Sequence, residues 1–308
     1  MNEPLMSIIV CTYNRCESLR DTMTALKQQR LGPGDAVELL IVDNNSNDET
    51  KEVIDDLSKE FSFPVRYIFE PAQGLSFARN RGVKEAKGEF IAFTDDDVIP
   101  SENWISNLRA AFMQYDADCI GGPVIPLLKS EITLIYNIIN SNRGDKPILA
   151  KNVNDCRIYG ANMAFRASIF RELGAFRIDL GRVGNNLMAG EDTEMVRRIF
   201  KARKKMLYIP DAIVHHVELP ERQNIGYLRK WRFFSGKSVG IISKGNGEPF
   251  PFWLVRECLQ NLLHAIFSYV RGIKSSAVEK ELLFWFQMGQ IAGIVYGHSG
   301  RGLNSGKS

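Results

Sequence analysis

The sequence has few cysteines, and their spacing excludes two kinds of stabilised domain. The five cysteines of the 308-residue chain are scattered and form no C-x-x-C pair. Neither a disulfide framework nor a cysteine zinc site is therefore indicated. The N-terminus has no basic segment, and its apolar run, residues 5–11, is too short for a secretory leader. We expect a cytoplasmic protein in a reducing compartment.

Extremes of composition are also absent. Hydrophobic residues make up 44% and charged residues 24% of the chain, which excludes collagen-like, coiled-coil and low-complexity proteins. The net charge is only +3, but residues 222–308 carry 12 Lys and Arg against 4 Asp and Glu. A basic segment with aromatic residues suits nucleic acid or an anionic membrane surface, and charge alone does not separate the two.

Strands and helices alternate through the first hundred residues. Four β-rich apolar runs predict strands, at 7–13, 37–42, 65–69 and 89–94. Helical spacing predicts the intervening helices, around 19–26, 49–61 and 77–86. This alternation predicts a doubly wound, mostly parallel sheet of the Rossmann-like α/β class. Later strands are expected at 119–124, 159–165 and 206–209, and a helix from 190 to about 203.

Polar clusters follow the predicted strands, at the point where each strand ends. They are Thr12 to Arg15, Asp43 to Ser46, Gln73-Gly74 and Asp95 to Asp97. In doubly wound sheets, ligands bind beyond the carboxyl ends of the strands. We therefore expect these clusters to converge on one edge of the sheet.

The triplet Asp95-Asp96-Asp97 directly follows an apolar strand. Residues i and i+2 of an extended chain point the same way, so Asp95 and Asp97 would share a divalent cation while Asp96 meets another partner. Mg²⁺ and Mn²⁺ prefer carboxylate oxygens and leave coordination positions for phosphate oxygens. Asp is also common in solvated turns and at helix caps, so the triplet alone leaves both interpretations open.

Four motifs together resemble the family 2 glycosyltransferases, which have the GT-A fold. They are SIIVCTYNR from Ser7, LIVDNNS from Leu40, GLSFARN from Gly74 and FTDDD from Phe93. Their order and spacing match over roughly residues 5–220. The resemblance implies an inverting transferase that moves a sugar from a nucleotide-diphosphate sugar, with a UDP-sugar favoured, to an acceptor hydroxyl.

The resemblance implies a donor site built from residues that follow the strands. Its nucleotide-sugar contacts would come from Thr12, Tyr13, Asn14, Arg15, Asp43, Arg79, Asn80, Asp95 and Asp96. Within this set, Asp43 would recognise the base, and Arg79 would contact phosphate or a base carbonyl. Taken alone, Asp43 also suits a strand-end turn and Arg79 a surface helix position.

The resemblance also implies a bound Mg²⁺ or Mn²⁺ ion. Asp97 and Asp95 would be its ligands, and the ion would stabilise charge on the departing nucleotide diphosphate. Adjacent His215 and His216 point to opposite faces of a strand, so only one of them can approach the ion. We expect His216, whose alternative is an ordinary packed or exposed histidine.

Glu191 and Asp192 stand at the start of a predicted helix. Carboxylates are common there because they cap free N–H groups and complement the helix dipole. The family has its general base at the corresponding place, and Asp192 matches it. Asp192 would take the proton from the acceptor hydroxyl, and Glu191 would help to bind the acceptor. The irregular stretch 129–155 is expected to be an acceptor loop.

The catalytic domain is expected at residues 1–221, followed by a basic, aromatic-rich helical extension at 222–308. Helices are predicted at 224–243, 252–270 and 280–296. The run from Arg229 to Phe234 matches no nucleic-acid-binding signature, so no nucleic acid partner is expected. Two interpretations stay open: peripheral attachment to the inner face of the plasma membrane, and packing on the catalytic domain or in a homodimer interface.

The expected partners are a nucleotide-diphosphate sugar and a carbohydrate or lipid-linked acceptor, in the synthesis of cell-surface polysaccharide, glycolipid or glycoprotein. Two alternatives are weighed. A sugar nucleotidyltransferase would need a glycine-rich loop after the first strand, and Thr12 to Arg15 contains no glycine. A non-catalytic scaffold that binds nucleotide sugars would not need both the aspartate triplet and the Glu191-Asp192 pair.

Overall fold

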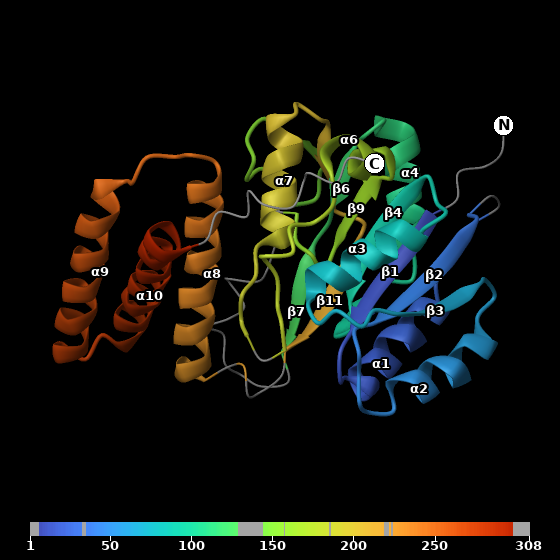
Figure 1. Cartoon of the computed structure of the whole chain (residues 1–308), viewed down its shortest axis with the longest axis horizontal. Coiled ribbons are helices and arrows are strands. Elements are labelled where there is room, and N and C mark those ends of the chain that lie inside the picture. The colour runs from blue at the N-terminus through green and yellow to red at the C-terminus, as the bar shows by residue number, and fades with distance from the viewer. Residues whose placement is uncertain are drawn as a thin grey trace. The chain divides into compact units, whose positions relative to one another are not determined.

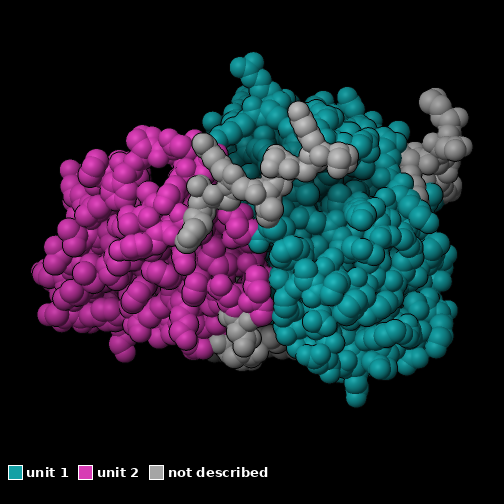
Figure 2. Space-filling view, in the orientation of Figure 1, with its two compact units in different colours: residues 1–178, 191–219 teal, residues 179–190, 220–308 magenta. Residues whose placement is uncertain are grey.

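The computed structural model describes residues 6–32, 35–128, 144–156, 158–184, 186–218, 222 and 224–297. The chain forms two compact units, shown in separate colours in Figure 2. The first comprises residues 1–178 and 191–219, and the second comprises 179–190 and 220–308. Most of the expected acceptor loop, residues 129–143, lies outside the described residues, as does residue 221 at the expected domain boundary.

An eight-stranded sheet forms the centre of the first unit (Figure 1), in the order β3-β2-β1-β4-β9-β6-β10-β8. Its strands are β1 (Met6–Thr12), β2 (Val37–Asp43), β3 (Val65–Phe69), β4 (Phe90–Asp95), β6 (Cys119–Gly121), β8 (Ile148–Leu149), β9 (Met163–Arg166) and β10 (Met206–Tyr208). The first four strands pair in parallel, whereas β9 runs antiparallel between β4 and β6. The predicted α/β class with a mostly parallel sheet is confirmed.

A second, three-stranded sheet consists of β5 (Val98–Pro100), β11 (Val214–Glu218) and β7 (Val124–Leu128). The single strand expected at 119–124 is wrong, because β6 and β7 belong to different sheets. Pro123 lacks the N–H that a central strand needs, and a Cβ at Gly122 would lie 2.2 Å from the Ala212 carbonyl oxygen. The chain therefore leaves one sheet at this point and enters the other.

Helices cover both faces of the large sheet, as the doubly wound prediction required. One face carries α1 (Cys16–Lys27), α2 (Thr50–Leu57) and α4 (Trp104–Tyr115), with a short 3₁₀ turn at Ser58–Glu60. The other carries α3 (Leu75–Glu85), α6 (Ser168–Leu173) and α7 (Glu191–Lys201). Side chains of β1 alternate between the two cores, Ile8 and Val10 in the first and Ile9 in the second.

The second unit contains three long helices, α8 (Ile225–Gly245), α9 (Phe252–Val270) and α10 (Lys274–Tyr296). Helix α10 packs against both α8 and α9 and lies between them (Figure 1). The predicted C-terminal helices are confirmed, although α10 begins six residues before the expected start at 280. None of the described helices combines the length and the apolar character needed to cross a bilayer.

Glycines bring α8 and α10 into close contact. A Cβ at Gly236 would lie 1.8 Å from the Phe286 carbonyl oxygen, and one at Gly289 would lie 1.9 Å from that of Phe233. Gly240 and Gly293 repeat this close approach one helical turn further on. Each helix thus contributes a G-x-x-x-G pair to one seam, and any side chain there would push the two backbones apart.

Candidate active site

The three consecutive aspartates lie at the carboxyl end of β4, where Arg15 meets two of them. Arg15 Nη1 donates to Asp96 Oδ1 at 3.0 Å and to Asp97 Oδ2 at 2.9 Å. The Thr12 hydroxyl, at the end of β1, donates to Asp96 Oδ2 at 2.8 Å. Asp96 therefore turns to Thr12 and Arg15, which fixes the direction in which its two neighbours point.

A second arginine joins the triplet to the start of α7. Arg79 of α3 is only 2% exposed. Its guanidinium donates to Glu191 Oε1 at 2.5 Å and to Asp95 Oδ1 at 3.2 Å. The surface-helix interpretation of Arg79 is therefore wrong, because a planar guanidinium with several donors bridges two carboxylates that lie 96 positions apart.

Asp95, Asp97 and His216 form a group that could hold a cation. One ligand atom from each lies within 4.8 Å of the others. His216 reaches this place because β11 pairs with β5 so that His216 lies opposite Val98, the residue after Asp97. His216 Nε2 lies 3.2 Å from Asp97 Oδ1. The structure thus brings together the three residues that were expected to bind a metal.

Two carboxyl groups of this cluster have raised pKa values. Burial raises the pKa of Asp96 to about 6, although the Arg15 guanidinium beside it acts to lower it. Burial likewise raises the pKa of Glu191 to about 7, against the opposing effect of Arg79. Glu191 Oε2 is buried and has no hydrogen-bond partner among the described residues. The four carboxyl groups of Asp95, Asp96, Asp97 and Glu191 outnumber the two arginines, and a divalent cation would offset this excess of negative charge.

Asp192, the expected general base, is held by backbone groups. Its Oδ2 accepts a hydrogen bond from the Gly160 N–H at 2.9 Å, and its Oδ1 accepts one from the Thr193 N–H at 2.6 Å. The side chain is partly exposed, unlike that of its neighbour Glu191, which is 4% exposed. Two adjacent carboxylates at one helix start therefore lie in different environments.

Asp43 lies at the end of β2, two strands away from the triplet. Its Oδ1 accepts from the Ser46 N–H and its Oδ2 from the Tyr67 hydroxyl, both at 2.9 Å. The strand-end turn expected as an alternative is therefore present. Each carboxylate oxygen has a second lone pair, so these bonds leave room for a further donor.

The loops after β1 and β2 are tied together by Asn14. Asn14 adopts a left-handed conformation with φ 50°, which asparagine tolerates better than most residues. Its N–H donates to Ser46 Oγ at 2.9 Å, and its Oδ1 accepts from the Asn47 N–H at 2.7 Å. Tyr13, beside it, is partly exposed at the end of β1.

Asn80 is a predicted donor residue whose side chain pairs with backbone groups outside the acidic cluster. Its Nδ2 donates to the Phe176 carbonyl oxygen and its Oδ1 accepts from the Phe176 N–H, both at 2.9 Å. Both polar atoms of its side chain are thus used to attach α3 to the segment after α6. Reciprocal pairing of this kind is typical of a residue that positions other elements.

Asn44 is a site-forming residue that sequence reasoning did not single out. Its buried side chain donates to the Ala72 carbonyl oxygen at 2.7 Å and accepts from the Gly74 N–H at 2.7 Å. It thereby holds the start of α3, the helix that carries Arg79. Its position directly after a buried strand could have indicated this role, but Asn44 was treated as part of the turn after Asp43.

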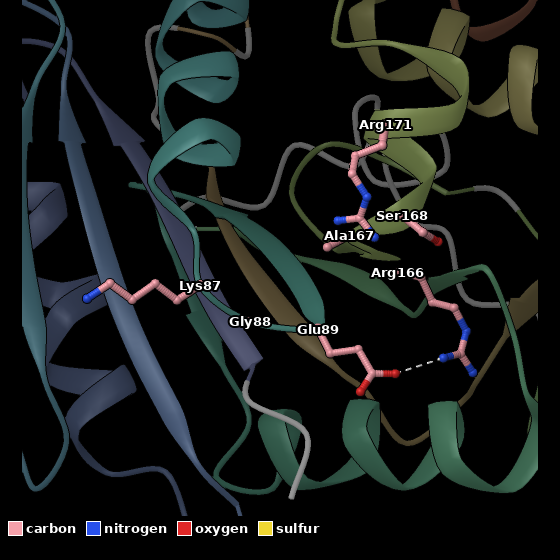
Figure 3. Close-up of a pocket in the computed structure, with 7 residues that line it drawn as sticks. All are labelled: Lys87, Gly88, Glu89, Arg166, Ala167, Ser168 and Arg171. Carbon is pink, nitrogen blue, oxygen red and sulfur yellow. Dashed lines mark hydrogen bonds and ion pairs between the residues drawn. The ribbon is translucent and has the colours of Figure 1, made fainter. Parts of the chain in front are cut away.

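A separate surface hollow of about 420 Å³ lies at the amino end of β4, and Figure 3 shows the side chains that line it. It is lined by Lys87, Gly88, Glu89, Arg166, Ala167, Ser168 and Arg171. The Glu89 carboxylate faces Arg166 there, with Oε1 3.1 Å from Nη1. In this sheet class ligands bind at the other edge, so the hollow is not part of the candidate site.

Known proteins resemble the chain in sequence. It is 28% identical over 251 residues to "Succinoglycan biosynthesis protein ExoM" of Rhizobium meliloti, covering 80% of this chain and 78% of that protein. It is 25% identical over 249 residues to "Glucosyl-dolichyl phosphate glucuronosyltransferase" of Haloferax volcanii, covering 77% of each.

Solved structures share the fold. "Mannosyltransferase PcManGT from Pyrobaculum calidifontis in complex with GDP-Man and Mn2+" has a TM-score of 0.67 at 16% identity, covering 96% of this chain and 88% of that one. S. aureus TarS has a TM-score of 0.54 at 15% identity, covering 93% of this chain and 55% of that one.

A family model also matches the part of the chain that carries β1 to β4, α6 and the aspartate triplet. The model is described as "Glycosyl transferase family 2", and it matches residues 7–174, more than half of the chain. With the GT-A fold of its structural neighbours, this match shows that the chain belongs to glycosyl transferase family 2 and is a glycosyltransferase.

Proposed function

We propose that the chain transfers a sugar, with inversion, from a nucleotide-diphosphate sugar to an acceptor hydroxyl at the carboxyl edge of the large sheet. The observation that carries this proposal is the meeting of Asp95, Asp97 and His216 within 4.8 Å. Groups of carboxylates this close together are costly unless a cation offsets their charge. The same edge carries the guanidinium of Arg15 and the Thr12 hydroxyl.

The donor set fits Mg²⁺ or Mn²⁺. Carboxylate oxygens suit both ions, and the imidazole nitrogen of His216 tilts the preference toward Mn²⁺. When bound, the ion supplies electrostatic stabilisation of the departing nucleotide diphosphate. Arg15 bridges Asp96 and Asp97, so it holds the Asp97 carboxylate in one orientation before a donor arrives.

The nucleotide would lie over the loops after β1 and β2. Asp43, whose two oxygens are held by Ser46 and Tyr67, would accept a hydrogen bond from a base N–H. That polarity suits uracil, the base of the favoured UDP-sugar, which presents a ring N–H donor, as do guanine and thymine. Tyr13 would pack beside the base, and Asn14 would hold the two loops against each other.

The acceptor would be activated by Asp192. This carboxylate is more exposed than Glu191, and two backbone N–H groups fix its direction. In its ionised form it would take the proton from the acceptor hydroxyl as that oxygen attacks the anomeric carbon. A single displacement from the face opposite the leaving group inverts the anomeric centre.

The acceptor is proposed to be a carbohydrate or a lipid-linked sugar, in the synthesis of a polysaccharide or another glycoconjugate. The names of two relatives support this class, since one is a succinoglycan biosynthesis protein and the other a glucosyl-dolichyl phosphate glucuronosyltransferase.

A thermal-shift screen tests the donor site. UDP, GDP, dTDP and their common sugars are added with and without Mn²⁺ to the wild type, to Asp97→Ala and to the control Asp56→Asn, whose carboxylate is 76% exposed on α2. A ligand that binds only the folded state raises its Tm. We expect a nucleotide-selective, Mn²⁺-dependent rise in the wild type and the control that Asp97→Ala abolishes. If no nucleotide raises Tm in any protein, the proposed donor site is wrong.

A further inference from the structure

Helix α9 has its large apolar side chains on the outside. Phe252, Leu259, Leu263, Ile266 and Val270 are 82%, 56%, 65%, 52% and 82% exposed. They follow one another at intervals of seven, four, three and four residues, which places them along one stripe of the helix. A helix that packs onto a soluble core shows the opposite arrangement, with its apolar stripe buried.

The side chains that α9 buries are mostly small or polar. They are Leu254, Cys258, Ala265 and Ser268, and Asn261 Nδ2 donates across the seam to α10, to Gln287 Oε1 at 3.0 Å. Gln287 Nε2 in turn donates to Glu257 Oε2 at 3.2 Å. Polar pairing inside and apolar side chains outside are typical of helices whose outer face meets lipid.

The seam between α8 and α10 supports the same conclusion. Its four glycines at G-x-x-x-G spacing allow backbone contact with little apolar side chain in between. Helices that assemble without a hydrophobic driving force between them use such small residues. The exposed apolar side chains of α9 are thereby left for a partner outside the unit.

The charge of the C-terminal segment favours a lipid surface over a second copy of the chain. Residues 222–308 carry 12 Lys and Arg against 4 Asp and Glu, a net charge of +8. Arg256, Arg271 and Lys274 are exposed along α9 or directly after it. Two such units placed face to face would repel each other, whereas an anionic headgroup layer attracts them.

We infer that α9 lies in the plane of an anionic lipid bilayer, with its apolar stripe among the acyl chains. Its 19 residues would lie along roughly 28 Å of the interface. Trp253 and Tyr269 have the amphipathic rings that favour the headgroup level. This inference goes beyond the proposed sugar transfer and does not depend on it.

Vesicle flotation of the full chain tests the inference, with phosphatidylcholine vesicles that contain or lack about a third of phosphatidylglycerol. We expect the wild type to float with the anionic vesicles. Leu259→Gln/Leu263→Gln should weaken that binding at least about tenfold, because two exposed apolar side chains no longer enter the bilayer. The control Met113→Gln/Leu149→Gln removes two side chains of similar exposure in the first unit, 59% and 51%, and should bind like the wild type.

Two further readouts keep the test decisive. Arg271→Gln/Lys274→Gln should weaken binding to anionic vesicles about tenfold, and added salt should do the same. The fluorescence of exposed Trp253 should shift to the blue on binding, and Trp253→Phe should remove most of that shift while the protein still floats. Failure of the wild type to float, or equal flotation of the Leu259/Leu263 variant, would overturn the inference. If the wild type forms a dimer without lipid and the Leu259/Leu263 variant is a monomer, the stripe instead contacts a second copy of the chain.

Discussion

Glu191 and Asp192 are neighbours in the chain, but their surroundings give them different chemistry. Burial raises the pKa of Glu191 to about 7, and one of its oxygens is bound to the buried Arg79. Asp192 is more exposed and accepts hydrogen bonds from two backbone N–H groups. A general base must be ionised and reachable by the acceptor. Of the pair, Asp192 is the more accessible to an acceptor, which supports its proposed role.

Replacing Asp192 by Asn should therefore lower kcat by about 10²–10⁴-fold and leave the affinity for the donor nearly unchanged. Asn keeps the size of the side chain but cannot take a proton. The measurement is steady-state transfer together with donor binding by calorimetry, once a donor has been identified.

Glu194→Gln is the matched control on the same helix. Glu194 pairs with Arg198 one turn further along α7, away from the acidic cluster, so its loss should change kcat by less than about threefold. Equal activity of Asp192→Asn and the wild type would remove Asp192 from the proposed mechanism.

At the scale of single elements, one buried carboxylate on β2 joins β1, β3 and the segment before β4. Glu38 of β2 is 4% exposed. Its Oε1 accepts from Ser7 Oγ at 2.6 Å and from the Lys87 N–H at 2.8 Å, and its Oε2 from Arg66 at 3.1 Å. Burial alone would raise the pKa of Glu38, but these donors outweigh it and hold the pKa below the usual value of a glutamate.

Because the pKa of Glu38 is lower in the folded state, its contribution to stability is present above the unfolded pKa of about 4.3 and is lost as pH falls through the folded value. Glu38→Gln should lower the free energy of unfolding by about 2–3 kcal/mol at pH 7. The gap between variant and wild type should narrow below about pH 4. Urea unfolding at pH 7 and pH 3.5 measures the difference in unfolding free energy between Glu38→Gln and the wild type. A difference that is the same at both pH values would contradict this role of Glu38.

The glycine seam of the second unit makes a separate prediction. Gly289→Val should lower the free energy of unfolding of this unit by about 2–3 kcal/mol or more, because its side chain would meet the Phe233 backbone of α8. Gly226→Ala, on the first turn of α8, is the control. The nearest atom to its added Cβ belongs to the Asn224 side chain at 3.2 Å, so a change of less than about 1 kcal/mol is expected. Thermal unfolding followed by circular dichroism compares the two.

Local sequence patterns predicted where helices and strands lie better than they predicted which elements and side chains contact each other. The apolar runs of β1, β2 and β4 identified the strands and the polar residues beyond them, because those signals lie within a few positions. The antiparallel β9 was not distinguishable, since strand direction depends on which neighbours it pairs with. Burial of Arg79 was also hidden, because its partner Glu191 lies 112 positions away. The apolar pattern of α9 was visible, but a sequence does not say which face is covered.

At the scale of the whole molecule, the two compact units have separate cores. The first is built around the two faces of the large sheet, and the second includes a cluster of Leu180, Met188, Ile241 and Ile242. A ligand stabilises the part of a protein that binds it. If the two units unfold separately, nucleotide and metal should raise the unfolding temperature of the unit that binds them and leave that of the other unchanged.

Scanning calorimetry should accordingly resolve two transitions. The nucleotide found in the donor screen, with Mn²⁺, should raise the midpoint of one transition, and Gly289→Val should lower the midpoint of the other. EDTA should reverse the first effect without changing the second. A single transition that moves as a whole with each perturbation would contradict the separate unfolding of the two units.

The residues proposed to bind the cation lie far apart in the sequence, so the ribosome synthesises them at different times. At about 5–20 residues per second, Asp97 is synthesised roughly 6 to 24 s before His216. During that interval the nascent chain already contains Arg15 and all three aspartates, but not the histidine or the β11 strand that presents it. If the proposed cation bound to the nascent chain, only oxygen atoms of this group would hold it at that stage. Selection of the metal through the imidazole nitrogen would begin only as translation of the first unit ends.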